Sequence, residues 1–174
     1  MRILINAGHS IVGKDCGAVG KTGLKESHVN ANIAKKIQTY LKDKGVKCVV
    51  FQQTDSLNEV INFVNKNNFD YGISIHCNAS TNIEANGVET LYYPTSKKGK
   101  ELASVIQNEL IKQTKLKDRG IKERSDLGFL RKTKCPCVLV ECAFISNDEE
   151  ESMLKNDYAI FAQAITRGIV KGIK

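Results

Sequence analysis

Short apolar runs alternate with amphipathic stretches along the first half of the chain, and this alternation constrains the fold more than any other feature. The runs at 2–6, 46–51 and 69–77 are short and largely apolar, as buried strands are. The stretches between them, near 26–44 and 56–67, place apolar residues at helical spacing. Strand–helix–strand alternation predicts parallel strands whose carboxyl ends share one edge of a sheet. We therefore expect an α/β fold.

The second half of the chain continues this pattern less regularly. We expect strands at 87–93, 128–131 and 138–142, helices at 96–113, 148–154 and 158–172, and a basic polar connection at 115–126. Pro94 closes the first of these strands, which places that strand at a sheet edge. The expected architecture is a single-domain three-layer sandwich, with a mostly parallel, mixed central sheet of about six strands flanked by helices.

Length and composition favour one compact domain spanning residues 1–174. The chain has 174 residues, of which 41% are hydrophobic, enough for one sizeable core. No apolar run approaches the roughly 20 residues that cross a bilayer, and the start lacks the apolar segment and cleavage site of a signal peptide. We therefore expect a protein made in the cytoplasm without a signal peptide and without membrane insertion. We also expect a monomer.

The cysteines favour a reduced protein. The chain has six of them, which are sparse at this length: Cys16, Cys48, Cys77, Cys135, Cys137 and Cys142. We expect them to be buried thiols rather than disulfides. Cys135-Pro136-Cys137 is not a zinc knuckle, because no second Cys or His pair stands at metal-ligand spacing.

Two histidines stand at the ends of expected parallel strands. His9 follows the first apolar run and His76 closes the third. In open α/β sheets ligands bind at the carboxyl edge of the strands, so both imidazoles are expected on the same rim. A lone histidine in such a place is more often hydrogen-bonded structure than a ligand, and it is the pair that favours a site.

Two carboxylates complete a candidate metal site. Glu26 opens the first helix, where the helix dipole alone also explains an acidic residue. Glu141 ends an all-apolar strand, which costs several kcal/mol unless something compensates the charge. Two imidazoles and one carboxylate from different elements form a common catalytic zinc set, and His9, Glu26 and His76 are the candidates. Zinc lowers the pKa of bound water from about 15.7 to about 7, and Glu141 is placed to take the water's proton.

Three ordered blocks of sequence then resemble the zinc-dependent N-acetylmuramoyl-L-alanine amidases of the amidase-3 type. The blocks are Gly8-His9, Asp15, Gly17-Ala18, Gly20, Glu26 and Asn30; Ser74 to Ala79; and Leu130-Arg131, Pro136, Val138 to Glu141 and Phe144 to Asn147. The resemblance spans nearly the whole chain. It departs from the family at Ser10, where many members have a second glycine.

The resemblance implies a function and roles for these residues. The family's zinc ligands correspond to His9, Glu26 and His76, and its catalytic carboxylate to Glu141. The implied reaction is hydrolysis of the amide between N-acetylmuramic acid and L-alanine of peptidoglycan, on the cell wall and after release from the cell. Many members carry a separate wall-binding domain, so the chain resembles the catalytic domain of a phage endolysin or a sporulation amidase. A catalytically inactive wall-binding module is the alternative.

Asn30 and Asn78 are candidates for hydrogen-bonding partners that orient the metal ligands. Asn30 is equally compatible with a position on the helix surface. His28 lies two residues after Glu26, about 200° around the helix, and is expected at the surface. Arg119 and Arg131 are candidates for contact with substrate carboxylates or for a solvated surface.

The formal charge of +7 attracts polyanions. Aromatic residues make up only 6% of the chain and no nucleic-acid motif is present, so specific nucleic-acid binding is not expected. Peptidoglycan and anionic wall polymers are the expected partners, and solubility is the plain alternative for the charge.

Overall fold

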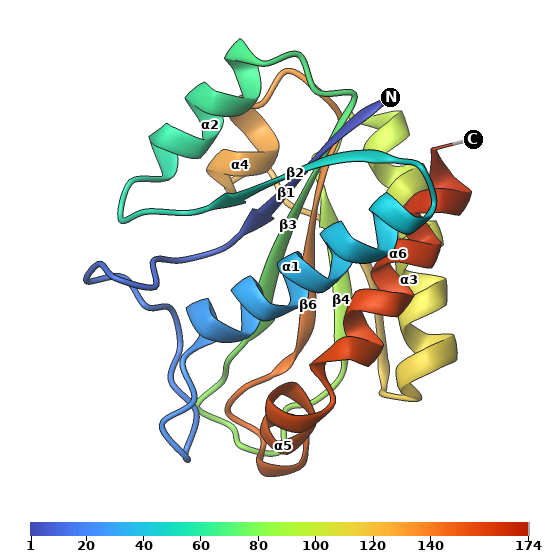
Figure 1. Cartoon of the computed structure of the whole chain (residues 1–174). Helices are drawn as coiled ribbons and strands as arrows, with labels where there is room; N and C mark the ends of the chain where they lie inside the picture. Colours follow the sequence, from blue (N-terminus) through green and yellow to red (C-terminus); the bar gives the residue numbers. More distant parts are fainter. Residues whose placement is uncertain (174) are drawn as a thin grey trace.

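A six-stranded sheet runs through the middle of the molecule, with helices on both faces (Figure 1). The computed structural model describes residues 1–173. The strands are β1 (Arg2–Ala7), β2 (Lys47–Gln52), β3 (Tyr71–Asn78), β4 (Val88–Tyr92), β5 (Asp118–Glu123) and β6 (Cys137–Phe144). The helices are α1 (Glu26–Asp43), α2 (Leu57–Lys66), α3 (Lys97–Thr114), α4 (Gly128–Lys132), α5 (Asp148–Asn156) and α6 (Tyr158–Gly172).

The order of strands across the sheet is β2-β1-β3-β6-β4-β5. The first four are parallel to one another, β4 runs antiparallel to β6, and β5 is parallel to β4. The predicted three-layer fold with a mostly parallel, mixed sheet is therefore confirmed. The carboxyl ends of β1, β3 and β6 lie at one edge of this sheet.

Alternate residues of the strands face two separate apolar layers. On one face α1, α3 and α6 pack against the sheet, with Ile33, Ile106 and Phe161 fully buried (Figure 1). On the other face α2 and α4 form a smaller layer, to which they contribute Val60 and Phe129. The strands alternate between the two layers because successive side chains point to opposite faces.

The smaller apolar layer stops before the carboxyl ends of β3 and β6. Leu139 of β6 belongs to this layer, whereas Glu141, two residues further on, does not. Glu141 is aligned in register with His76 of β3. Residues two apart on a strand point to the same face, so His76 and Glu141 lie on the face of α2 and α4, beyond the apolar cover.

The strand expected at 128–131 is wrong, because the segment forms helix α4. A strand would point Phe129 and Leu130 to opposite faces, but both side chains are buried in the layer shared with α2. A helical turn presents two neighbouring residues to one side. A Cβ at Gly128 would come within 2.9 Å of Leu57 Cδ2, so the glycine lets the two helices approach closely.

The placement of the edge strands is also corrected. The segment expected to be a polar connection, 115–126, contains strand β5, and β5 rather than β4 is the edge. The residues of β5 are half-buried or exposed, so the strand lacks the apolar alternation that marks a strand in sequence. All five residues of β4 are buried between β6 and β5. Pro94 lies after the last residue of β4 and interrupts no ladder.

The remaining expected elements are confirmed with small shifts of their ends. Asn147 caps α5, its side chain accepting a hydrogen bond from the backbone N–H of Glu150. All six cysteines are free thiols, as expected, but the expected burial is wrong for half of them: three are buried (Cys77, Cys137 and Cys142) and three are partly exposed (Cys16, Cys48 and Cys135). Among residues 1–173, no helix is both long enough and apolar enough to cross a membrane.

Candidate active site

His9 and His76 meet at the carboxyl edge of the sheet, as the sequence predicts. His9 lies just after β1 with a φ of +62°, an uncommon backbone conformation for a residue with a side chain. The preceding residue, Gly8, packs against the imidazole of His76. A Cβ at Gly8 would lie 2.3 Å from His76 Cε1, so a glycine is needed for the two strands to bring the histidines together.

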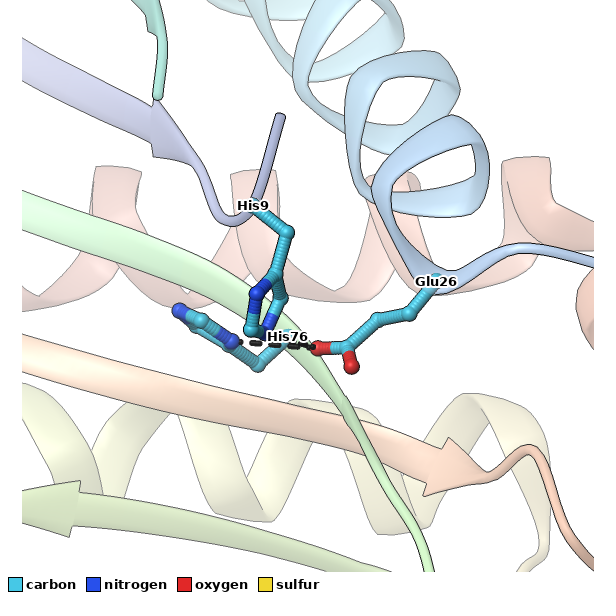
Figure 2. A group of neighbouring side chains, drawn as sticks. All are labelled: His9, Glu26 and His76. Atoms are coloured by element: carbon cyan, nitrogen blue, oxygen red, sulfur yellow. Dashed lines mark hydrogen bonds and ion pairs between the residues drawn. The ribbon is translucent and has the colours of Figure 1, made fainter. Parts of the chain in front are cut away.

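Glu26 joins the two imidazoles from the first turn of α1 (Figure 2). Its Oε1 is 3.3 Å from His9 Nε2 and 3.1 Å from His76 Nδ1. One donor atom from each of the three residues lies within 4.8 Å of the other two. Glu26 therefore does more than complement the helix dipole, because its carboxylate contacts both histidines.

The spacing of these donor atoms fits a metal ion. Four ligands arranged tetrahedrally at about 2.0–2.1 Å from an ion are about 3.3 Å from one another. The two distances to Glu26 Oε1, 3.1 and 3.3 Å, match the edge of that tetrahedron. Three protein donors leave the fourth position free for water or substrate. Within residues 1–173, no other group of three or more His, Cys, Asp or Glu side chains meets this test.

Several donors fix the carboxylate of Glu26. Its Oε1 accepts hydrogen bonds from the backbone N–H of Cys77 at 3.0 Å and from Asn30 Nδ2 at 3.4 Å. Its Oε2 accepts from the backbone N–H of Ala18 at 2.9 Å. Gly17, with a φ of +71°, leaves room for this oxygen, since a Cβ there would lie 2.6 Å from Oε2. The loop before α1 is thus shaped around the carboxylate.

Asp15, which belongs to the first block of the family resemblance but had no role assigned to it from the sequence, orients His9. Its Oδ1 is 2.8 Å from His9 Nδ1, which leaves Nε2 facing Glu26. The loop that carries Asp15 is held in turn by Asp55, which accepts the backbone N–H groups of Lys14 and Asp15 at 3.0 Å each. A carboxylate on the second nitrogen of a ligand histidine is a common outer-shell arrangement.

The charges of the cluster favour a cation beside Glu26. Burial lowers the pKa of His9, but the hydrogen bonds and charges of Glu26 and Asp15 outweigh it and raise the pKa to about 9. Burial alone would raise the pKa of Glu26, yet the hydrogen bonds of His76 and His9 hold that pKa well below its usual range. An ionised Glu26 next to two imidazoles therefore attracts a positive charge, from a proton or from a metal ion.

The two candidate orienting asparagines differ. Asn30 is buried and donates to the backbone oxygen of Gly8 at 3.2 Å as well as to Glu26, so it links one candidate ligand to the end of β1. Asn78 donates to Glu89 Oε1 at 3.1 Å and, within residues 1–173, makes no hydrogen bond to the three candidate ligands. His28 is exposed, as expected.

Glu141 lies next to the cluster on the adjacent strand. It is aligned in register with His76, and its Oε2 is buried without a hydrogen-bond partner among the described residues. Burial raises the pKa of Glu141 to about 7, with His76 acting in the opposite direction and the charges of Glu26 and Glu89 adding to the rise. Its carboxyl group therefore exists in both protonation states near neutral pH.

Glu89 is a further charged residue that sequence reasoning missed. It is aligned in register with Glu141 on the antiparallel strand β4 and is only 7% exposed. Arg119 Nε lies 2.7 Å and Lys122 Nζ 2.6 Å from Glu89 Oε2. These cations outweigh the effect of burial and hold the pKa of Glu89 below its ordinary value. Polar and apolar residues alternate around it in the sequence, so an acidic residue there gave no distinct signal.

Comparison with known proteins places the whole chain among amidases. Residues 3–173 match the sequence profile of the Amidase_3 family, described as N-acetylmuramoyl-L-alanine amidase. The N-acetylmuramoyl-L-alanine amidase LytC of Bacillus subtilis (strain 168) is 38% identical over 177 residues, covering 97% of this chain and 34% of LytC. The chain therefore spans about a third of the length of that relative.

Solved structures share the fold over almost their full length. The crystal structure of N-acetylmuramoyl-L-alanine amidase from Clostridium difficile 630 aligns with a TM-score of 0.91 and 32% identity, covering 99% of this chain and 96% of that one. The catalytic domain of the CD27L endolysin, which targets Clostridia difficile, aligns with a TM-score of 0.85 and 32% identity. That alignment covers 98% of this chain and 97% of the endolysin domain.

Proposed function

The chain belongs to the Amidase_3 family of N-acetylmuramoyl-L-alanine amidases, and from this premise we propose that it hydrolyses the amide between N-acetylmuramic acid and L-alanine in peptidoglycan. The observation that carries the proposal is the cluster of His9, Glu26 and His76 beside the half-buried carboxyl group of Glu141. The family supplies the identity of the bond. The cluster supplies the chemistry, because an amide needs an activated water and a proton donor for its departing amine.

His9, Glu26 and His76 would hold a zinc ion, with Asp15 and Asn30 orienting His9 and Glu26. Zinc suits two imidazoles and one carboxylate with an open fourth position, and the donor spacing fits its bond lengths. When bound, zinc supplies a Lewis acid that polarises the amide carbonyl and acidifies water.

Glu141 would serve as the proton carrier. In its ionised form it takes a proton from the attacking water, and in its protonated form it gives that proton to the nitrogen of L-alanine as the amide breaks. Burial raises the pKa of Glu141 above its ordinary value, which favours the protonated form needed for the second step, whereas a bound zinc ion would favour the ionised form needed for the first. Glu141 is partly exposed, so a water and the departing amine can reach its carboxyl group, and Oε2 has no hydrogen-bond partner among the described residues that would hold the group in one orientation.

We also propose that anionic wall polymers attract the protein and that it acts on the wall after release from the cell. Support comes from the formal charge of +7 and from the nature of the proposed substrate.

The test combines a metal assay with a chemical assay. Purified protein is analysed for bound metal and incubated with peptidoglycan, and new amino groups are counted and identified as N-terminal L-alanine. We expect zinc and new L-alanine amino termini in the same preparation. Glu141→Gln should bind zinc without releasing amino groups, and Glu101→Gln, a matched change on the exposed face of α3, should behave as the unaltered protein. Binding to walls with no release of amino groups by the unaltered protein would instead indicate an inactive wall-binding module.

A further inference from the structure

Strand β5 brings cations to the sheet face that carries Glu141. Glu141 is aligned with Glu89 of β4, and Leu91, two residues further along β4, is aligned with Lys122 of β5. Because residues two apart on a strand share a face, Glu89, Leu91 and Lys122 all lie on the same face as Glu141. The catalytic carboxyl group proposed above therefore has a charged group beside it on the far side from His76.

Glu89 anchors this charged group. Burying a carboxylate costs several kcal/mol unless it is paired and hydrogen-bonded. Glu89 is paired twice, with Arg119 at 2.7 Å and Lys122 at 2.6 Å, and it accepts a third hydrogen bond from Asn78. Two cations on one carboxylate leave a net positive charge. That charge is held at the surface one strand away from Glu141.

The cations of this segment are not equivalent. Arg119 is engaged on several sides: its Nε bonds Glu89, Nη1 lies 3.4 Å from the backbone oxygen of Asn86, and its guanidinium carbon lies 4.7 Å from the centre of the Phe144 ring. Arg124 is neutralised by Asp126 through two hydrogen bonds of 2.8 and 2.6 Å. Neither arginine presents a free positive charge.

Lys122 differs from both arginines. Its ammonium group has three N–H donors, and one hydrogen bond, to Glu89, is present among the described residues. Its side chain is 43% exposed. Lys122 thus presents a cation with spare donors to the solvent, while Glu89 fixes its position.

We propose that Lys122, held by Glu89, binds a free carboxylate on the peptide part of the substrate, and this inference rests on the proposed amidase function. Lys122 Nζ lies 2.6 Å from Glu89 Oε2, and Glu89 is aligned with Glu141 on the neighbouring strand, where aligned residues are about 4.5–5.5 Å apart. A peptide spans about 3.3–3.6 Å per residue. A carboxylate on the second or third residue of the stem peptide therefore reaches Lys122 when the scissile amide lies at Glu141. The preferred substrates are muramoyl peptides in which that carboxylate is ionised rather than amidated.

The test uses pairs of soluble muramoyl peptides that differ only in a carboxylate or a carboxamide, one pair at the second residue and one at the third. For one of the pairs we expect the unaltered protein to show a kcat/KM about tenfold higher on the carboxylate peptide, a factor typical of one charge-assisted hydrogen bond. Lys122→Gln should remove this preference, mainly through a higher KM, and leave the carboxamide peptide almost unchanged. Lys122→Arg should keep most of it, and Lys36→Gln, on the exposed face of α1, should keep all of it.

Equal cleavage of both members of both pairs by the unaltered protein would overturn the inference. So would an equal loss on both peptides in Lys122→Gln, because that result indicates a structural role beside Glu89. Calorimetric binding of the same peptides to Glu141→Gln separates this inference from the amidase proposal, since it needs no turnover. A carboxylate preference in binding that Lys122→Gln abolishes supports the inference even if no amide is cleaved, and equal binding contradicts it.

Discussion

The two faces of β3 and β6 differ near the carboxyl ends of the strands: one face forms the apolar core and the other carries residues of the candidate site. On one face Ile73, Ile75 and Val140 are fully buried under α1, α3 and α6. On the other face His76 and Glu141 lie beyond the apolar layer of α2 and α4. A slip of one residue in the pairing would exchange the two faces, so the burial of the apolar side fixes the register of the polar side. The core thereby positions the candidate site.

Glu141→Gln tests the polar face and has the largest expected effect. The change keeps the shape of the side chain and removes its ability to carry a proton. We expect kcat to fall about 10²- to 10⁴-fold, the usual contribution of a general acid or base. The free energy of unfolding should hold or rise slightly, because a half-buried group that can carry a charge is replaced by a neutral amide. Steady-state kinetics and denaturant unfolding of the same sample measure both, and a drop in kcat below threefold would exclude the assigned role.

Ile75→Ala tests the apolar face of β3, one residue from His76. Ile75 is fully buried, and truncating such a side chain lowers the free energy of unfolding by about 2–5 kcal/mol. The activity of each folded molecule should change little, because the side chain points away from the cluster of His9, Glu26 and His76. Urea unfolding combined with kinetics below the transition gives both numbers. A large loss of kcat in the folded variant would mean that the two faces are not independent.

The sequence predicts the apolar face better than the polar one, and β5 and α4 show why. Buried strands are recognisable in the sequence as apolar runs, so β1, β3 and β6 are predicted with small errors in their ends. Strand β5 is an edge strand whose side chains are half-buried or exposed, and its composition is that of a loop. The segment around Phe129 and Leu130 was predicted as a strand and is helix α4, because two neighbouring apolar residues fit a short buried strand as well as a helical turn.

The candidate site shows the same limit. His9, His76 and Glu141 are detectable because each interrupts or ends an apolar run, and the three candidate metal ligands do converge. Asp15 and Glu89 are not detectable in this way, because a carboxylate in a loop or on an alternating strand is ordinary. Their importance comes from contacts across 6 residues, for Asp15 with His9, and across 30 and 33 residues, for Glu89 with Arg119 and Lys122. Only the folded chain brings them together.

Asp15→Asn probes the support of the polar face and should have an intermediate effect. The amide oxygen accepts a hydrogen bond from His9 Nδ1–H less strongly than the carboxylate does, so His9 becomes a weaker ligand. We expect the affinity for zinc to fall about 10- to 100-fold, as for other partners of ligand histidines. Competition with a chromogenic chelator measures the affinity, and Asp43→Asn at the exposed end of α1 is the control. An affinity equal to that of the control would remove Asp15 from the site.

Salt should have the smallest effect, and it separates the charged surface from the site. If the formal charge of +7 draws the protein to anionic wall polymers, salt weakens the attraction as the Debye length falls from about 10 Å at 0.1 M to about 3 Å at 1 M. We expect activity on whole walls to fall severalfold over this range. Activity on a small muramoyl peptide should change much less. Equal losses on the two substrates would show that salt acts on the site, and the charge would then serve solubility.

The most direct test of the account is the zinc content of purified variants, measured by elemental analysis after dialysis against zinc. The cluster of His9, Glu26 and His76 predicts about one zinc ion per chain in the unaltered protein and almost none after His9→Ala, Glu26→Gln or His76→Ala. Glu141→Gln should retain about one ion, because Glu141 lies beside the cluster and not in it. Full zinc content in the three ligand variants, or loss of zinc in Glu141→Gln, would contradict the assignment.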